Sequence, residues 1–213
     1  MTKVVLFDAV GTLFGVRGSV GEIYSALALE SGVQANPREI EARFHQVFRQ
    51  RTPPTSQARA WWHQTVLETF AGFDFADFEG YFNQVWKYFA SDQAWELYPE
   101  TVEVLMALRT QGVVLAIVSN FDERLHPVLE ALAIRSYFSV VAVSTEVGAA
   151  KPDPRLFEFA LRQLGVSADQ AWHVGDAHED VVGAEAAGIR ALHLRRQGAD
   201  TAGCISSLRG VLA

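Results

Sequence analysis

Four short stretches of the chain combine acidic, hydroxyl, amide and amino side chains that could share one chemical task. They are Asp8-Ala9-Val10-Gly11-Thr12, Ser119-Asn120, Lys151-Pro152 and Gly175-Asp176-Ala177-His178-Glu179-Asp180. Taken singly, each has an ordinary structural explanation, such as an acid favoured at the start of a helix. Taken together they favour a chemical interpretation, because each lies at a predicted strand end or helix start.

The residue types indicate phosphoryl chemistry. Crowded carboxylates repel one another unless a cation lies among them, and Mg²⁺ prefers one or two carboxylates with water and phosphate oxygens. A carboxylate can attack phosphorus to form an acyl phosphate, and turn N–H groups around Gly11 can hold phosphoryl oxygens. The hydroxyl of Ser119 and the ammonium of Lys151 would then stabilise charge on the transferred group.

The stretches before these polar groups are predicted to be strands buried on both faces, because they are continuous apolar runs. The runs are Val4–Phe7, Val113–Val118, Ser139–Val143, Ala171–Val174 and Ile189–His193. Helix patterns lie between them, at Thr101–Arg109, Leu125–Ala133, from Asp153-Pro154 onwards and at Asp180–Ala187. This alternation predicts an α/β fold with a doubly wound, Rossmann-like parallel sheet.

A parallel sheet binds its ligand beyond the carboxyl ends of the strands. Connecting the predicted strands therefore brings one set of polar residues to a single edge of the sheet. The set is Asp8, Ser119, Lys151, Asp176 and Asp180.

Residues 15–95 are predicted to be a helical insert, since we find no convincing strand there. They hold 15 of the 24 aromatic residues, enough for a small core. Asn36-Pro37-Arg38-Glu39 combines an N-cap, a first-turn proline and a capping-box glutamate, and Arg51–Ser56 is typical of a loop. Phe78–Phe89 carries an amphipathic apolar stripe. The adjacent Trp61-Trp62 should point in different directions on a helix, and one could contact a substrate or partner.

The net charge, the cysteine count and the lengths of the apolar runs argue against several classes of protein. With 18 basic and 25 acidic residues in 213, the net charge is −7, which argues against nonspecific binding to nucleic acid or an anionic membrane. Cys204 is the single cysteine, so no intrachain disulfide can form. No apolar run is long enough for a membrane span or a signal peptide. We therefore expect a soluble, cytoplasmic protein that is a monomer or a weak homodimer.

These stretches resemble the motifs of the haloacid dehalogenase-like (HAD) hydrolase superfamily, in order and over essentially the whole chain. The first motif matches Phe7–Leu13, the second Val118–Asn120, the third Lys151-Pro152, and the fourth Gly175-Asp176 with Asp180. The insert resembles the family's helical cap domain, which implies a core of residues 1–14 and 96–213 and a cap of 15–95. Trp61-Trp62, Ser119–Asp122 and Lys151–Arg155 also resemble the subgroup called HAD hydrolase domain-containing proteins.

The resemblance implies catalytic and substrate-binding roles. Asp8 would be the nucleophile, and Ser119 and Lys151 would hold the phosphoryl group or orient Asp8. The cap would close over a small phosphorylated substrate and select it. The residues implied to bind the substrate are Gly11, Thr12 and Asn120.

The resemblance also implies a magnesium site. Asp8, the carbonyl of Val10 and Asp176 would ligate Mg²⁺, and Asp180 would act through water. The side chain at position 10 contributes nothing to this site, so the metal site should survive a substitution there.

Val10 is where the chain departs from the family. Typical family phosphatases carry a second Asp there, which protonates the leaving group and activates the attacking water. Valine cannot move a proton, and a general acid or base contributes ~10²–10⁴ in rate. We therefore expect weak turnover of ordinary phosphomonoesters. Either the leaving group is a good one, or a substitute acid exists among His45, His63 and His178.

Two other functions are compatible with valine at position 10. Family dehalogenases, which act on halogenated substrates, also lack the second Asp and work without metal, but they tend to replace the acid that is Asp176 here. A non-catalytic protein that binds a phosphorylated ligand or a partner would also tolerate the loss. The family's phosphonate-cleaving branch uses a cap lysine. The only lysine of residues 15–95 is Lys87, which lies in the predicted aromatic helix, so the sequence disfavours this function.

Overall fold

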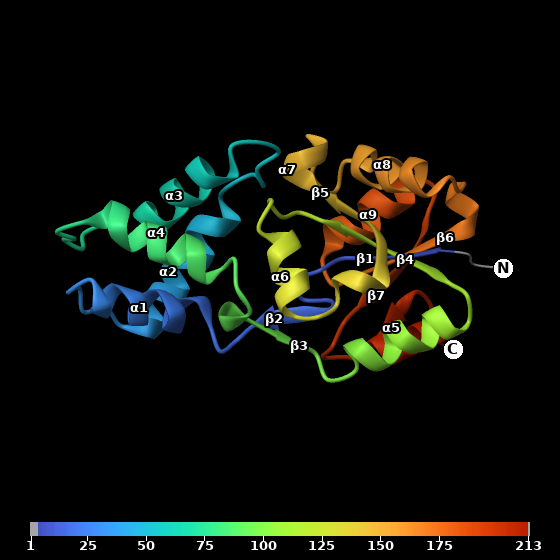
Figure 1. Cartoon of the computed structure of the whole chain (residues 1–213), viewed down its shortest axis with the longest axis horizontal. Helices are drawn as coiled ribbons and strands as arrows, with labels where there is room; N and C mark the ends of the chain where they lie inside the picture. The colour runs from blue at the N-terminus through green and yellow to red at the C-terminus, as the bar shows by residue number, and fades with distance from the viewer. Residues whose placement is uncertain (1–3, 213) are drawn as a thin grey trace.

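A parallel sheet of six strands in the order β5-β4-β1-β6-β7-β8 forms the centre of the computed structural model, which describes residues 4–212 (Figure 1). The strands are β1 (Val4–Phe7), β4 (Val114–Ser119), β5 (Phe138–Val143), β6 (Ala171–Gly175), β7 (Arg190–Leu194) and β8 (Cys204–Ile205). The first five lie within one residue of the predicted runs at each end. The two-residue β8 was not predicted, because so short a strand has no apolar pattern of its own. The predicted α/β fold class is confirmed.

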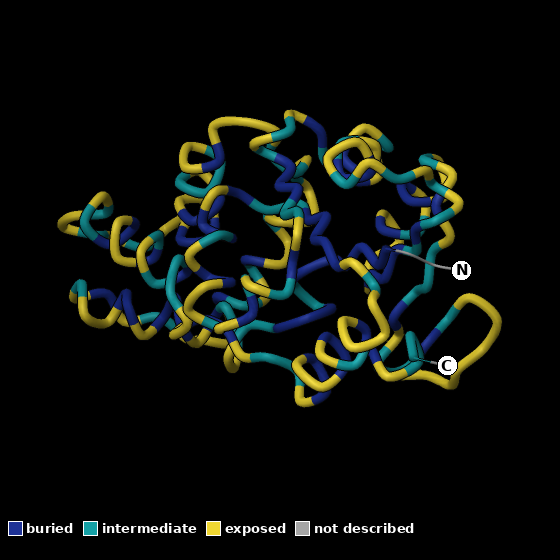
Figure 2. The backbone as a smooth tube through the Cα atoms, turned by 45° about the vertical axis from the view of Figure 1, so that its right-hand side comes forward, coloured by how far each residue is buried: buried dark blue, intermediate teal, exposed yellow. Residues whose placement is uncertain are grey.

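Helices cover both faces of this sheet, which is why its strands are continuous apolar runs. Val4 and Leu6 pack in an apolar cluster with α8 and α9, whereas Val5 and Phe7 pack with α5 and α6. In Figure 2 the central strands are accordingly drawn as buried. The helices of this part are α5 (Thr101–Thr110), α6 (Leu125–Ala131), α7 (Ser144–Val147), α8 (Pro154–Leu164) and α9 (His178–Ala186).

The chain after β1 builds a helical lobe at one end of the molecule (Figure 1). Its helices are α1 (Val20–Glu30), α2 (Pro37–Arg49), α3 (Ala58–Thr69) and α4 (Phe78–Tyr88). As predicted, α2 begins at Pro37, and Asn36 Oδ1 accepts hydrogen bonds from the N–H groups of Arg38 and Glu39 at 2.9 and 3.4 Å. Nowhere in residues 4–212 is a helix both long and apolar enough to traverse a bilayer.

The prediction that residues 15–95 contain no strand was wrong at both ends of the segment. Strand β2 (Phe14–Val16) pairs antiparallel with β3 (Trp95–Leu97), and the pair connects the sheet to the helical lobe. Three-residue strands are too short for an alternating pattern to be recognised. Their pairing also joins residues about 80 positions apart, which local sequence cannot reveal.

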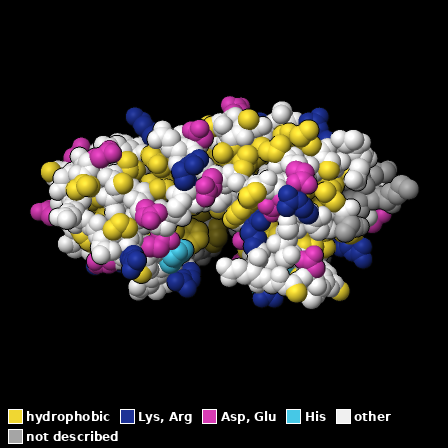
Figure 3. Space-filling model, turned by 90° about the horizontal axis from the view of Figure 1, so that it is seen from below, with side chains coloured by type: hydrophobic (Ala, Val, Ile, Leu, Met, Phe, Trp, Pro, Cys, Tyr) yellow, Lys and Arg dark blue, Asp and Glu magenta, His cyan; other side chains and the backbone are white. Residues whose placement is uncertain are grey.

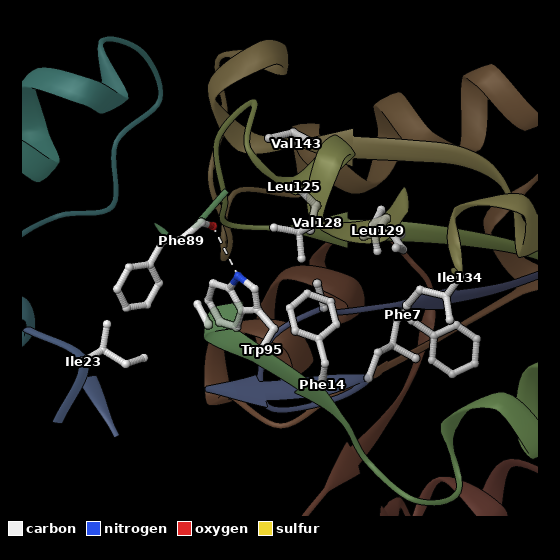
Figure 4. Packing of buried hydrophobic residues seen from close by; sticks show 14 of the residues in the cluster. Phe7, Phe14, Ile23, Phe89, Trp95, Leu125, Val128, Leu129, Ile134 and Val143 are labelled. Carbon is white, nitrogen blue, oxygen red and sulfur yellow. Dashed lines mark hydrogen bonds between the residues drawn. The ribbon is translucent and has the colours of Figure 1, made fainter. Parts of the chain in front are cut away.

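One apolar core runs from the sheet into the helical lobe through this ribbon. Figure 4 shows Phe14 and Trp95 of the ribbon between Phe7 of the sheet and Phe89 of the lobe. The rings of Phe14 and Trp95 meet edge to face at 5.4 Å, and the Trp95 indole N–H donates to the Phe89 carbonyl at 3.2 Å. We propose that the core is residues 1–14 and 96–213 and the cap is 15–95, with the ribbon straddling both boundaries.

Candidate active site

The polar residues that follow the strands meet where the chain connections diverge. β1 lies between β4 and β6, so the chain leaves neighbouring strands in opposite directions and a crevice opens at their carboxyl ends. Asp8 follows β1, Ser119 ends β4 and Asp176 follows β6. These three line one cavity of about 310 Å³ together with Lys151 and Asp180. The structure thus brings together the five residues predicted to share this edge.

Lys151 links two of the carboxylates. Its Nζ lies 2.6 Å from Asp8 Oδ1 and 2.6 Å from Asp180 Oδ1. The Ser119 hydroxyl donates to the same Asp8 oxygen at 3.2 Å, and all four side chains are buried. Asn120, predicted to bind the substrate, lines the same cavity and also holds the Lys151 backbone, since its amide donates to the Lys151 carbonyl at 3.0 Å and accepts from the Lys151 N–H at 2.7 Å.

Burial and neighbouring charges shift the pKa values of the three aspartates in this cluster. Burial raises the pKa of Asp8 to about 7, although the charge of Lys151 lowers it. The carboxylates of Asp180 and Asp176 also raise it. Burial alone would raise the pKa of Asp180, but Lys151 and His173 hold it well below its usual range. Partial desolvation, followed by the charge of Asp180, raises the pKa of Asp176. One ammonium therefore serves two carboxylates, and Asp8 is the one that takes a proton more easily.

Asp180 is anchored by groups that the sequence did not single out as functional. Its Oδ1 lies 2.8 Å from Nε2 of the fully buried His173, and its Oδ2 accepts from the Ala177 N–H at 3.1 Å. His173 lies inside a predicted buried strand, so its place in the sequence pattern is the same as that of an apolar core residue. The pattern does not show that its ring contacts an acid. Only a preference for pairing a buried histidine with an acid could have drawn attention to it.

The turn after Asp8 is shaped around Asp176. Gly11 has a φ of +88°, and a Cβ at this position would overlap the Asp176 carboxyl group, so glycine is required both by conformation and by space. Thr12, predicted to bind substrate, is fully buried and donates to Asp176 Oδ1 at 3.2 Å. These two predicted substrate residues therefore position the acid of the fourth motif.

The arrangement fits a magnesium ion. Asp8, Asp176 and Asp180 each offer an oxygen within 4.8 Å of the others. Within residues 4–212, Asp8 Oδ2 and Asp176 Oδ2 take no hydrogen bond, whereas both oxygens of Asp180 are already bonded. Free carboxylate oxygens are the donors that Mg²⁺ prefers. Asp8 and Asp176 are the residues whose oxygens fit the ion, and Asp180 fits a supporting position.

The helical lobe closes the other side of the cavity. Its contribution comes from Phe48, Arg51, Pro53, Pro54, Trp61 and Trp62. Trp61 and Trp62, expected to point in different directions, both line this cavity with rings that meet edge to face at 4.9 Å, while their indole N–H groups donate to different partners, Thr52 and Asp122. A ring on an α-helix is long enough to lean across the turn, so adjacent positions can share a cavity.

None of the three histidines named as substitute acids lines the Asp8 cavity in the described part of the chain. His63 bonds to Glu79 at 2.6 Å and His178 is exposed. His45 bonds to Glu41 at 2.9 Å and lines a neighbouring apolar cavity. Lys87 is exposed and likewise lines neither cavity.

An arginine near the C-terminus also supports the site and was not predicted. Arg196 donates to the carbonyls of Gly11 and Thr12 at 3.3 and 2.8 Å and forms an ion pair with the buried Glu100 at 2.7 Å. Its guanidinium lies 3.5 Å above the Tyr98 ring. Because Arg196 follows β7 without belonging to a motif, only the folded chain reveals its contact with the turn after Asp8.

Comparisons with known proteins point to one family. The family model for haloacid dehalogenase-like hydrolases matches residues 2–188. Haloacid dehalogenase-like hydrolase domain-containing protein 3 from Danio rerio is 32% identical over 205 residues, 91% of this chain and 85% of that protein.

Solved structures show the same fold. A HAD phosphatase from Thermococcus onnurineus has a TM-score of 0.71 at 26% identity, covering 100% of this chain and 98% of that chain. The L-2-haloacid dehalogenase from Xanthobacter autotrophicus has a TM-score of 0.77 at 17% identity, covering 99% and 97%. The family match, the whole-length relative and the convergent motifs lead to one conclusion: the chain belongs to the haloacid dehalogenase-like hydrolase family.

Proposed function

We propose that this protein is a magnesium-dependent phosphatase that hydrolyses a small phosphomonoester through an aspartyl phosphate on Asp8. The observation that carries this proposal is the setting of Asp8, a buried carboxylate at the carboxyl end of β1, 2.6 Å from Lys151 Nζ and beside Asp176. The similarity to a HAD phosphatase supports it.

In this mechanism Asp8 supplies the attacking oxygen. Lys151 and Ser119 hold its Oδ1 and fix its orientation. As the bond from Asp8 to phosphorus forms, the bond from phosphorus to the ester oxygen breaks, and that oxygen leaves with the electron pair and takes its proton from water. Lys151 and Ser119 stabilise the charge on the phosphoryl oxygens. Water then attacks phosphorus, which releases phosphate and restores the Asp8 carboxylate.

Asp8, Asp176 and the Val10 carbonyl would hold Mg²⁺, which supplies positive charge opposite the phosphoryl oxygens when bound. Next to a divalent cation Asp8 would remain ionised at neutral pH, despite its raised pKa. Val10 offers no proton, so departure of the alcohol depends on the leaving group itself. This predicts slow turnover of alkyl phosphates.

The test is hydrolysis of phenyl phosphate by the full chain, with Mg²⁺ and with EDTA. We expect slow, magnesium-dependent release of phosphate that Asp8→Asn abolishes and that leaves a labelled phosphoryl group on Asp8 after an acid quench. Mg²⁺ should raise the melting temperature of the wild type, but not of Asp176→Asn. Asp153→Asn, at the half-buried N-cap of α8 and outside the Asp8 cavity, is the matched control. Undiminished hydrolysis by Asp8→Asn would refute the proposal.

A second candidate follows from Val10, because an apolar residue there also suits a hydrolase that releases halide. The free oxygen of Asp176 favours the metal-dependent reaction instead. Halide release from a 2-haloacid in the presence of EDTA, dependent on Asp8, would identify the second candidate as correct.

A further inference from the structure

A second cavity of about 310 Å³ adjoins the active-site cavity on the side of the helical lobe. Figure 3 shows a hollow between the two lobes with hydrophobic side chains inside it. The two cavities share five residues, which are Val10, Phe48, Trp62, Asn120 and Phe121. A molecule held at Asp8 could therefore extend past Val10 into the second cavity.

The second cavity is lined chiefly by aromatic and β-branched side chains. Val16 and Val20 come from the start of the insert, Val85 and Trp86 from α4, and Phe89 from the chain that follows. Its volume is at the lower end of the ~300–1,000 Å³ of small-molecule sites. Its volume and lining suit one or two rings or a short alkyl chain.

The charged groups on its wall are already paired within the described residues. Arg124 donates to Asp122 through Nε and Nη2, both at 2.7 Å, and its guanidinium lies 3.7 Å above the Trp86 ring. His45 is bonded to Glu41 at 2.9 Å. A charged leaving group would therefore have no free counter-charge in this cavity, and burying it there would be costly.

Val10 stands where the two cavities meet and offers no proton to a departing oxygen. Aromatic alcohols are more acidic than alkyl alcohols, so they leave as anions with less help from a general acid. The apolar cavity and the apolar side chain at its entrance thus point to the same kind of leaving group.

We propose, resting on the phosphatase function above, that the substrate is the phosphate monoester of a neutral aromatic alcohol whose rings occupy the second cavity. Asp8 bonds to phosphorus as the bond to the aryl oxygen breaks. The electron pair leaves on the aryl oxygen, which takes its proton from water. Hydrolysis of the aspartyl phosphate then yields inorganic phosphate.

The experiment compares kcat/KM for 2-naphthyl and phenyl phosphate, whose alcohols have similar acidity but differ by one ring. We expect the wild type to favour the naphthyl ester by about tenfold or more. Val20→Phe, which fills the second cavity, should bring the ratio close to one. Val47→Phe is the matched control, since Val47 is also half-buried in the helical lobe but lines neither cavity.

A measurement on the unaltered protein guards against a variant that does not fold. 2-Naphthol should inhibit phenyl phosphate hydrolysis competitively and more strongly than phenol. Equal kcat/KM for the two esters, with hydrolysis still dependent on Asp8, would overturn the aromatic-substrate inference and leave the phosphatase function intact. Hydrolysis of both esters by Asp8→Asn would instead overturn the phosphatase function.

Discussion

The indole N–H of Trp62 in helix α3 donates to Asp122 Oδ2 at 2.9 Å and so joins the helical lobe to the loop after β4. Asp122 also accepts two hydrogen bonds from the Arg124 guanidinium, which stacks on Trp86 of α4. Trp62 and Trp86 of the lobe thus contact the two members of one ion pair, Asp122 and Arg124. This contact holds the lobe over the active-site cavity.

Replacing Trp62 by Phe should weaken that closure. Phe keeps an aromatic ring but removes a hydrogen bond to a buried charged acceptor, worth about 1.5–3 kcal/mol. We expect the free energy of unfolding, measured in urea, to fall by about that amount and KM for phenyl phosphate to rise. Trp61→Phe is the control, because its indole bonds to the more exposed Thr52 carbonyl at 2.9 Å. An equal fall in the free energy of unfolding of the two variants would show that the hydrogen bond to Asp122 stabilises the fold no more than the one to Thr52.

Asp8 should make the protein more stable at mildly acidic pH when divalent cations are absent. Its pKa is about 7 in the folded chain and 3.8 in the reference state. Between these values the folded chain holds a proton that the unfolded chain has lost, so stability falls as pH rises from about 4 to 7. The whole effect amounts to a few kcal/mol.

Asp8→Asn removes this titration. In EDTA, its free energy of unfolding should decline less than that of the wild type between pH 4 and 7, and it should be the more stable of the two above pH 7. Asp153→Asn should parallel the wild type in this window, because Arg155 lowers the pKa of Asp153 and its contribution changes only at lower pH. Parallel curves for Asp8→Asn and the wild type would contradict the raised pKa.

Arg196 should affect turnover more than substrate binding. It holds the Gly11 and Thr12 carbonyls, and through that turn it sets the position of Asp8 relative to Asp176. A small misplacement of reacting groups can cost about 10²-fold in rate. We expect Arg196→Gln to lower kcat by about 10- to 100-fold with little change in KM, and Arg195→Gln, at the exposed neighbouring position, to change neither. A rise in KM with normal kcat would place Arg196 in substrate binding instead.

The sequence was sufficient for five of the six strands of the sheet and for the convergence of its acids, because both follow from local patterns. A continuous apolar run predicts a buried parallel strand, and the carboxyl ends of parallel strands meet at one edge. Asp8, Asp176 and Asp180 therefore came together as expected, although they are far apart in the chain.

What the sequence could not provide depends on contacts between distant segments. The β2–β3 ribbon pairs Val16 with Trp95, and no local pattern encodes that pairing. Asn120 and Thr12 are predicted to bind the substrate because their motifs are near it, and nothing in the sequence indicates that their side chains also bond to Lys151 and Asp176. Polar side chains beside a site can serve either purpose, and only the geometry distinguishes them.

Val10→Asp tests whether the missing proton donor limits the rate. The new carboxyl group would stand at the entrance between the two cavities, where it could protonate the departing alkoxide oxygen and activate water. We expect kcat for ethyl phosphate, whose alkoxide leaves poorly, to rise by about 10- to 100-fold, within the range for general acid–base catalysis. For phenyl phosphate the gain should be smaller, because its leaving group needs less protonation. Val10→Asn is the matched control, with a similar shape and no transferable proton. If Asn raised turnover as much as Asp, polarity at position 10 rather than proton transfer would explain the gain.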